Sequence, residues 1–354
     1  MKLGIIGLSQ SGKTTIFNAL TRGHAPTTAS AGRIEVHTAV VDVPDPRLDR
    51  LAAMFQPKKT THARVTYADI AGLEGGSASK GGISGALLNQ LTQMDGFLHV
   101  VRCFEDANVP HPAGGVEARR DIESMESELI LNDLISVERK LERLAEERKK
   151  GGGDKALLER QLALFERLQA TLSANTPLRK VETTAEEEKI LSSFGLLSRK
   201  AVLTVFNVGE GQPAPQVSLP GHATVALQGK LEMEIAQLPP EDAALFMREY
   251  GIEEAGLECI IRLSYDLLGL QSFFTFNEDE LRAWTIRRGA SALEAAGAIH
   301  TDMQRGFIRA EVIAYDELAA LGGLAEARSQ GKLRLEGKEY VVQDGEIVYI
   351  RFSP

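Results

Sequence analysis

The sequence predicts an α/β protein in which a largely parallel sheet is interrupted by a helical hairpin and followed by a small α+β unit. Short apolar runs alternate with helix-like segments in the first half of the chain, as is typical of a parallel sheet flanked by helices. A long amphipathic segment separates two of these runs, and strand-like runs return after residue 272. Since 354 residues exceed one typical core, we expect two or three structural units.

The sheet of the first unit is predicted from six compact runs rich in apolar or β-branched residues. Runs of this kind are typical of buried strands. The first is followed by a helix-like segment, Thr15–Thr21. The expected strands are Leu3–Ile6, Ile34–Val43, Arg64–Ile70, Phe97–Phe104, Ala201–Phe206 and His222–Leu227.

Two amphipathic helices are predicted between the fourth and fifth of these strands. Asp121–Lys150 carries an apolar residue every three to five positions and mostly charged residues elsewhere, so one helix face is apolar and the other solvated. Glycines 151–153 break this pattern before a second such segment over Leu158–Leu172. The pattern favours an antiparallel hairpin, either a projecting arm for a partner or a packed insertion without one.

The last part of the chain is predicted to be a separate α+β unit. A helix is expected over Tyr315–Leu321, and Gln343–Glu346 is typical of a tight turn before the last strand. The expected strands are Leu281–Ile286, Phe307–Ile313, Lys338–Val342 and Ile347–Phe352. The predicted domains are therefore residues 1–121 with 199–271, the hairpin 122–198, and residues 272–354.

The charge balance excludes a globally basic surface for nucleic acid. Lysine and arginine total 40 against 49 acidic residues, a formal net charge of −9, so we expect no DNA partner, although a local basic patch stays open. No run approaches the roughly 20 apolar residues that span a bilayer, and the first apolar run is too short for a signal peptide. The only cysteines, Cys103 and Cys259, are interpreted as reduced thiols, and we expect a cytoplasmic protein without membrane contact.

A phosphate-binding loop is predicted directly after the first strand. Gly7–Thr14 fits the pattern G-x-x-x-x-G-K-S/T and precedes a helix. Its glycines let backbone N–H groups point at phosphate oxygens, and the helix N-terminus adds partial positive charge. Lys13 would reach the β- and γ-phosphates, and the Thr14 hydroxyl would ligate Mg²⁺.

A carboxylate follows at the end of the third predicted strand, in Asp69-Ile70-Ala71-Gly72. Asp69 is predicted to hold Mg²⁺, and the Gly72 N–H to meet the γ-phosphate. The next residue is Leu73, where Ras-like enzymes place a glutamine that orients the attacking water. Because leucine cannot make that hydrogen bond, either hydrolysis is slow or another group orients the water.

The segment Asn207-Val208-Gly209-Glu210 follows the fifth predicted strand. Guanine-specific relatives carry N-K-x-D here, and its aspartate accepts hydrogen bonds from the guanine base. Because this chain lacks the lysine and has glutamate for aspartate, the tetrad disfavours guanine and leaves adenine open.

Together these segments resemble the Obg-like ATPases, called the YchF group in bacteria, over nearly the whole chain. The resemblance rests on the loop Gly7–Thr14, Asp69–Leu73 and the tetrad, together with Val43–Leu48, Val100–Asp106, Arg282–Ile286, His300–Asp302 and Arg305–Phe307. It implies a Ras-like P-loop NTPase domain, an inserted antiparallel helical hairpin and a C-terminal β-grasp domain of the TGS type. It also implies ATP preferred over GTP and association with the ribosome.

The resemblance also assigns site residues. His111, on the loop after the fourth strand, matches the catalytic histidine of bacterial members, so His111 and Lys13 are the expected catalytic residues, with Thr14 and Asp69 on Mg²⁺. The adenine would be read partly by Asn207 and the segment after it. The expected nucleotide-binding residues are Gly7, Ser9, Gln10, Ser11, Gly12, Lys13, Thr14, Thr15, Gly72, Asn207, Val208, Glu210, Gln228 and Gly229.

Several departures point to a divergent member of that family. The usual asparagine of the P-loop is replaced by Gln10, the switch threonine by Arg33, and the usual S-A-K by Gln228-Gly229-Lys230. Thr27 or Thr28 could replace the switch threonine, and potassium stimulation is left open. The leading hypothesis is a slow ATPase switch that regulates a translation-related or ribosomal partner, with RNA contacts through the hairpin and the C-terminal domain. The alternatives are a nucleotide-gated binding module with negligible hydrolysis, and a GTPase.

Overall fold

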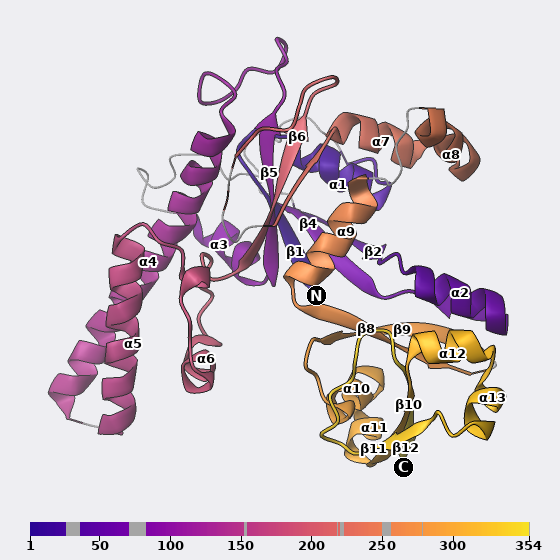
Figure 1. Ribbon diagram of the computed structural model, residues 1–354. Helices are drawn as coiled ribbons and strands as arrows, with labels where there is room; N and C mark the ends of the chain where they lie inside the picture. Colours follow the sequence, from indigo (N-terminus) through magenta and orange to yellow (C-terminus); the bar gives the residue numbers. More distant parts are fainter. Residues whose placement is uncertain are drawn as a thin grey trace. The chain divides into compact units, whose positions relative to one another are not determined.

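The structure, a computed structural model, describes residues 1–25, 36–70, 83–151, 154–217, 219, 223–249, 256–277 and 279–353 (Figure 1). The chain forms two compact units. The first comprises Met1–Ala39 and Thr66–Leu257, and the second comprises Val40–Val65 and Glu258–Pro354. No helix in the described ranges is long and apolar enough to cross a membrane.

A six-stranded sheet with the order β2-β4-β1-β5-β6-β7 carries the P-loop. The five strands from β4 to β7 pair in parallel. Central strands β5 and β6 are buried along nearly their whole length, which explains their continuous apolar sequence. Because the strands are parallel, their carboxyl ends meet at one edge of the sheet. The bounds are β1 Lys2–Ile6, β2 Val36–Asp42, β4 Arg64–Ile70, β5 Gly96–Cys103, β6 Ala201–Val208 and β7 Ala223–Leu227.

The helix predicted over Thr15–Thr21 is present as α1 and begins two residues earlier, at Lys13. The helix that follows the P-loop, α1, packs against α7, and the close approach is made at Gly229, where a Cβ atom would lie 2.7 Å from Ile16 Cδ1. The bounds outside the hairpin region are α1 Lys13–Thr21, α3 Gly85–Thr92, α7 Gly229–Gln237 and α8 Pro240–Glu249, with α9 (Gly256–Leu267) starting at the end of this unit.

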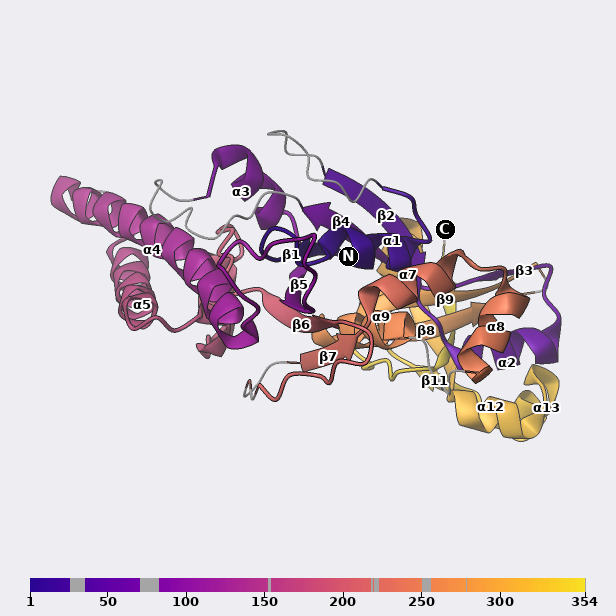
Figure 2. The same cartoon turned by 90° about the horizontal axis from the view of Figure 1, so that it is seen from above.

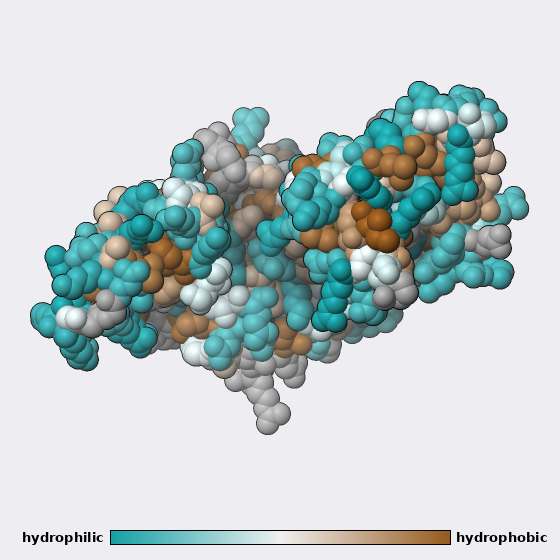
Figure 3. Space-filling model, turned by 90° about the horizontal axis from the view of Figure 1, so that it is seen from below, coloured by the Kyte–Doolittle hydropathy of each residue, from teal (hydrophilic) through white to brown (hydrophobic). Residues whose placement is uncertain are grey.

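The predicted hairpin is present as α4, Ala118–Lys150, and α5, Lys155–Ser173, which lie side by side in Figures 1 and 2. Gly151 ends α4 with φ 69°, and Asp154 begins α5 by accepting the N–H groups of Ala156 and Leu157. Ile130, Val137 and Leu144 of α4 pack against Phe165 and the buried leucines of α5 to form the core between the two helices. On the hairpin, at the left of Figure 3, hydrophilic side chains surround a smaller hydrophobic area.

Buried Asp133 ties α4 to the chain just before β6. Its carboxylate accepts the N–H groups of Leu197 and Ser198, both at 2.7 Å, and the Ser198 hydroxyl at 2.6 Å. Burial raises its pKa to about 6, against the lowering effect of these hydrogen bonds. Beyond α5, a short helical turn at Leu178–Lys180 and helix α6, Ala185–Leu191, lead back to the sheet.

The second unit contains another six-stranded sheet, with the order β11-β10-β12-β8-β9-β3. Antiparallel pairs join β11 to β10, β10 to β12, and β8 to β9, whereas β12–β8 and β3–β9 are parallel. The helices and strands of this unit are α2 Pro46–Phe55, β3 Lys59–Thr61, β8 Leu270–Phe276, β9 Glu280–Arg287, α10 Ala292–Ile299, α11 Thr301–Arg305, β10 Phe307–Ile313, α12 Tyr315–Leu321, α13 Leu324–Ser329, β11 Arg334–Glu336 and β12 Ile347–Phe352.

The predicted strand Lys338–Val342 is wrong. This segment makes only an isolated bridge between Val341 and Ser291, and the strand lies earlier, at Arg334–Glu336. Val342 is buried in the core and its N–H donates to the Ala290 carbonyl, so the apolar pattern reflects a core-filling loop. The tight turn at Gln343–Glu346 is present, with Gly345 at φ 81°.

Residues 40–65 and 258–271 differ from the predicted domain boundaries. They were assigned to the first domain, but they belong to the same compact unit as the C-terminal residues. Within that unit, β3 pairs with β9 through Lys59, Thr60 and Thr61. A three-residue edge strand with a partner more than 200 residues away leaves no periodic signal in the sequence.

Candidate nucleotide-binding site

The P-loop winds tightly between β1 and α1, as the sequence predicted. Gly7, Gln10 and Gly12 have positive φ angles of 155°, 61° and 94°. Glycine is required at position 12, because a Cβ atom there would lie 2.2 Å from Asn207 Nδ2. Ser9 and Gln10 are exposed at the tip of the loop, and α1 starts at Lys13, so its free N–H groups face the loop.

The Lys13 ammonium group is folded back into the loop. Its Nζ donates to the carbonyl oxygens of Gly7, at 3.1 Å, and Leu8, at 2.9 Å. Burial lowers the pKa of Lys13 to about 8, and the negative charge of Asp69 only partly opposes this. A cation that is buried against two neutral carbonyls lacks a full counter-charge, and an anionic ligand would supply one.

Thr14 and Asp69 meet beside this lysine. The Thr14 hydroxyl donates to Asp69 Oδ2 at 2.7 Å, and Asp69 is 3% exposed. Its other carboxylate oxygen, Oδ1, has no hydrogen-bond partner among the described residues. A hydroxyl and a buried, half-unpaired carboxylate are hard oxygen ligands, so these two residues fit a magnesium ion.

Asn207, at the end of β6, joins the P-loop to the segment after β7. Its Nδ2 donates to the Ser11 carbonyl at 3.0 Å, and its Oδ1 accepts the Gly229 N–H at 3.0 Å. Gln228 directly precedes α7, which begins at this buried glycine. Asn207 is buried and uses both ends of its amide on the protein, so its geometry is that of a clamp between the two segments.

Val208 and Glu210 follow this clamp. Val208 is buried, whereas Glu210 is exposed in the turn that begins after β6. The intervening Gly209 donates its N–H to Gln212 Oε1 at 3.1 Å. The Glu210 carboxylate is therefore the freely accessible polar group of the tetrad.

His111 lies on the loop between β5 and α4 and is enclosed there. Its Nε2 lies 2.9 Å from Asp121 Oδ2, and both side chains are only 4% exposed. Its Nδ1 accepts the Ala113 N–H at 3.1 Å. Among the described residues His111 forms no hydrogen bond with the P-loop, so the structure does not bring the two predicted catalytic residues into contact.

Arg102 and Asp121 are two site-edge residues that sequence reasoning missed. Buried Arg102 donates to the carbonyls of Phe104, at 3.0 Å, and Val109, at 2.7 Å, and so holds the first half of the His111 loop. The signal in the sequence that could have identified Arg102 is an arginine inside the otherwise mostly apolar run Phe97–Phe104. Between Arg102 and Phe104, the Cys103 thiol has its pKa raised to about 12 by burial and by Asp121, which makes it unreactive.

Some predicted site residues lie outside the described residues. They are Gly72 of the nucleotide-binding set, Leu73, and the switch candidates Thr27, Thr28 and Arg33.

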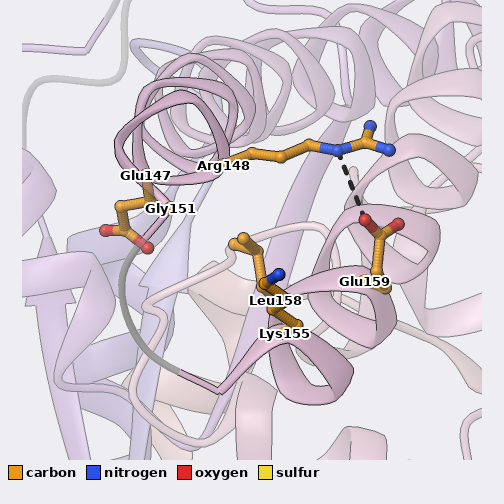
Figure 4. Close-up of a pocket in the computed structure, with 6 residues that line it drawn as sticks. All are labelled: Glu147, Arg148, Gly151, Lys155, Leu158 and Glu159. Atoms are coloured by element: carbon orange, nitrogen blue, oxygen red, sulfur yellow. Dashed lines mark ion pairs between the residues drawn. The ribbon is translucent and has the colours of Figure 1, made fainter.

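A pocket at the end of the hairpin is separate from this site (Figure 4). Arg148 and Glu159 form an ion pair at 3.3 Å across it, and both are well exposed. An exposed pair of this kind contributes little to stability. The other lining residues are Glu147, Gly151, Lys155 and Leu158.

Known proteins resemble this chain along its whole length. The YchF GTPase C-terminal family, described as a protein of unknown function, matches residues 270–353, and the 50S ribosome-binding GTPases match residues 2–140. The ribosome-binding ATPase YchF of Bacillus subtilis (strain 168) is 39% identical over 99% of this chain and 98% of that protein. Its namesake from Haemophilus influenzae is 40% identical over 99% of both.

A solved structure agrees with these matches. The Schizosaccharomyces pombe YchF GTPase superposes with a TM-score of 0.85 and 31% identity, over 99% of this chain and 97% of that one. The match covers the Ras-like P-loop domain, the inserted helical hairpin and the C-terminal β-grasp domain. The chain therefore belongs to the YchF family, the Obg-like branch of the P-loop NTPases.

Proposed function

We propose that this chain is a Mg²⁺-dependent nucleotide switch that binds and slowly hydrolyses ATP in preference to GTP. The observation that carries the proposal is the buried group formed by Lys13, Thr14 and Asp69 at the P-loop. It combines a cation without a full counter-charge and a carboxylate oxygen without a partner. A nucleoside triphosphate with its metal ion would supply both, since its phosphates carry negative charge and the metal ion binds a carboxylate oxygen.

The roles of these residues follow from their chemistry. Lys13 would leave the loop carbonyls for the β- and γ-phosphates, and the N–H groups of the P-loop would hold the phosphate oxygens. Thr14 and Asp69 would hold Mg²⁺, which neutralises charge on the phosphates when it is bound. The loop keeps its shape because Asn207 clamps Ser11 to Gly229.

The preference for ATP rests on the tetrad 207–210. Because the Asn207 amide is used in the clamp, we assign the adenine to the backbone around Val208 and to exposed Glu210. A glutamate accepts hydrogen bonds and so suits the adenine amino group. The curated relatives are named ribosome-binding ATPases, which supports ATP as substrate, whereas the matching fission-yeast structure is called a GTPase.

Hydrolysis is assigned to His111, with Lys13 stabilising charge on the phosphates. In Ras-like enzymes a glutamine orients the water, and this chain has Leu73 in that position. Slow turnover is consistent with the enclosed position of His111. The same observation favours the second candidate, a nucleotide-gated binding module with negligible hydrolysis. Single-turnover hydrolysis with excess protein separates them, and His111→Ala should keep ATP affinity while losing most turnover.

The partner is proposed to be the ribosome, contacted by the hairpin and the C-terminal domain in the cytoplasm. The names of the relatives and the ribosome-binding family match support this assignment. RNA contacts would fall on exposed arginines such as Arg287 and Arg305. Binding that weakens steeply with salt would indicate RNA.

The first experiment is calorimetric titration of the nucleotide-free protein with non-hydrolysable ATP and GTP analogues, each with Mg²⁺. Tighter ATP binding by about tenfold, equal to about 1.4 kcal/mol, is expected. Equal or tighter binding of the GTP analogue would overturn the assignment of the adenine to the tetrad and favour a GTPase.

A further inference from the structure

The contacts of His111 determine which of its ring nitrogens carries a proton. The Ala113 N–H points at Nδ1 at 3.1 Å, so Nδ1 is the acceptor and holds a lone pair. In the neutral ring the proton is then on Nε2, which donates to Asp121 Oδ2 at 2.9 Å. An imidazole fixed in this way has Nε2 tied to a carboxylate, and its unprotonated Nδ1 can act as a base once the contact with the Ala113 N–H opens.

We infer that Asp121 is the positioning residue of His111, and that Nδ1 is the nitrogen that accepts a proton from the attacking water. The inference rests on the proposed catalytic role of His111. In the proposed step the water oxygen bonds to the γ-phosphorus, and the bond between the γ-phosphorus and the β–γ bridging oxygen breaks. ADP leaves with that electron pair, the water proton passes to Nδ1, and the Asp121 carboxylate stabilises the resulting imidazolium.

Asp121 is itself held in the geometry that this role needs. Its second oxygen, Oδ1, accepts from Arg120 Nε at 3.0 Å and from Nη2 at 2.8 Å. It lies in the first turn of α4, where the helix dipole favours a negative charge. Both Asp121 oxygens are therefore occupied, one by the imidazole and one by the guanidinium, and the carboxylate is fixed beside the ring.

The two contacts of the ring differ in how easily they open. The Nε2 contact joins His111 to a long helix, whereas the Nδ1 contact is a hydrogen bond to a backbone N–H only two residues away. A local shift at Ala113 would free Nδ1 and leave the contact with Asp121 in place. Arg120 also donates to the carbonyls of Ala113 and Gly115, at 3.3 Å and 2.6 Å, so the group that holds Asp121 also controls this part of the loop.

The loop starts at the correct edge of the sheet for this role. It leaves the carboxyl end of β5, whose parallel neighbours are β1, which leads into the P-loop, and β6, which ends at Asn207 and Val208 (Figure 1). Arg102 holds the first half of the loop through the carbonyls of Phe104 and Val109. His111 therefore lies on a short loop that starts at the phosphate side of the sheet and is held by Arg102 and Arg120.

The test combines ring ¹⁵N NMR with single-turnover ATP hydrolysis in the full-length chain. The variants are Asp121→Ala, Asp121→Asn, His111→Ala and the double variant, and the control is Glu123→Ala, an exposed carboxylate on the same helix. His111→Ala also assigns the His111 signal among the seven histidines. Spectra are recorded with Mg²⁺, with and without a non-hydrolysable ATP analogue.

We expect the Nε2–H tautomer in the natural protein and in Glu123→Ala, and a mixture of tautomers in Asp121→Ala. Turnover in Asp121→Ala should fall by about 10²-fold, the scale of general base catalysis, with no further fall in the double variant relative to His111→Ala. Asp121→Asn should regain part of the Nε2–H tautomer and part of the turnover, because its amide oxygen can still accept from Nε2. This variant also guards against simple misfolding.

Two results would overturn the inference. One is an unchanged Nε2–H tautomer in Asp121→Ala. The other is a fall in turnover from His111→Ala to the double variant that is as large as the fall from the natural protein to Asp121→Ala. If turnover in His111→Ala equals that of the natural protein, the proposed catalytic role of His111 fails instead. The tautomer signals still decide in that case whether Asp121 positions the ring.

Discussion

Nucleotide binding should draw a proton onto Lys13 when the pH lies above neutrality. Burial in the P-loop lowers the pKa of this side chain to about 8, because its Nζ faces two neutral carbonyl oxygens. The negative charge of a triphosphate favours the ammonium form and raises the pKa again. Above pH 8 the free protein has lost most of this proton, and binding must restore it.

The size of the effect follows from the two pKa values. If the complex returns the pKa of Lys13 to its ordinary value of about 10.4, the apparent Kd should rise about eightfold between pH 7.5 and pH 9, or about 1.2 kcal/mol. This window lies above the ordinary titration of a terminal phosphate, near pH 6. The change in affinity is therefore assigned to the protein.

Calorimetry in two buffers that differ in ionisation enthalpy measures the proton directly. At pH 9 the uptake should approach one proton per nucleotide bound, and at pH 7 it should be near zero. Lys13→Met keeps the apolar stem without the charge, so it should bind more weakly, with no uptake and a flat Kd over the same pH range. A flat Kd in the natural protein, without proton uptake, would refute a deprotonated Lys13 in the free state.

Three further predictions address the clamp, the loop and the hairpin. Asn207→Ala should lower the free energy of unfolding by about 1–3 kcal/mol, since two buried backbone groups lose a partner, and should weaken ATP-analogue binding; unchanged urea unfolding would argue against the clamp. Gly12→Ala puts a Cβ atom 2.2 Å from Asn207 Nδ2 at φ 94°, so affinity should fall at least about tenfold, whereas Gly85→Ala, with open space around its Cβ position, should bind normally. The folded-state pKa of Asp133, raised to about 6, lies above its unfolded value, so its contribution favours folding at low pH and is lost, by up to about 3 kcal/mol, as pH rises from 4 through 6. Urea unfolding of the natural protein and of Asp133→Asn between pH 4.5 and 7 should show that the difference between their free energies of unfolding changes with pH. A difference that stays constant would contradict this.

The fold could be predicted from the sequence at many segments that repeat an apolar pattern, although the run Leu270–Phe276, which forms β8, was not predicted. Arg64–Ile70, Phe307–Ile313, Ile347–Phe352 and the helix Tyr315–Leu321 were predicted with the bounds that the structure has. The pattern failed at Lys338–Val342, because burial of a loop residue such as Val342 gives the same apolar signal as a strand. It also missed Lys59–Thr61, since a short edge strand is defined by its partner rather than by its own residues.

The candidate site was predictable only where a fixed spacing carries the chemistry. The pairing of Thr14 with Asp69 follows from a P-loop and a carboxylate at the end of a neighbouring parallel strand. The contact between His111 and Asp121 could not be predicted, because it depends on the path of an irregular loop. The use of both amide atoms of Asn207 was hidden for a similar reason, since it depends on where β7 ends relative to β6.

Most of the groups that would meet the nucleotide already have protein partners. The Lys13 ammonium rests on two carbonyls, the Thr14 hydroxyl on Asp69, and the His111 ring on Asp121 and the Ala113 N–H. This avoids the cost of leaving buried polar groups unpaired, and at the P-loop the exceptions among the described residues are Asp69 Oδ1 and the Ser11 hydroxyl. Each step of binding or hydrolysis then exchanges one partner for another, so affinity and rate depend on differences between interactions rather than on their sums. The response of such a site to its ligand is set by the contacts that must open: the Lys13 contacts with the loop carbonyls, and the Ala113 contact with His111.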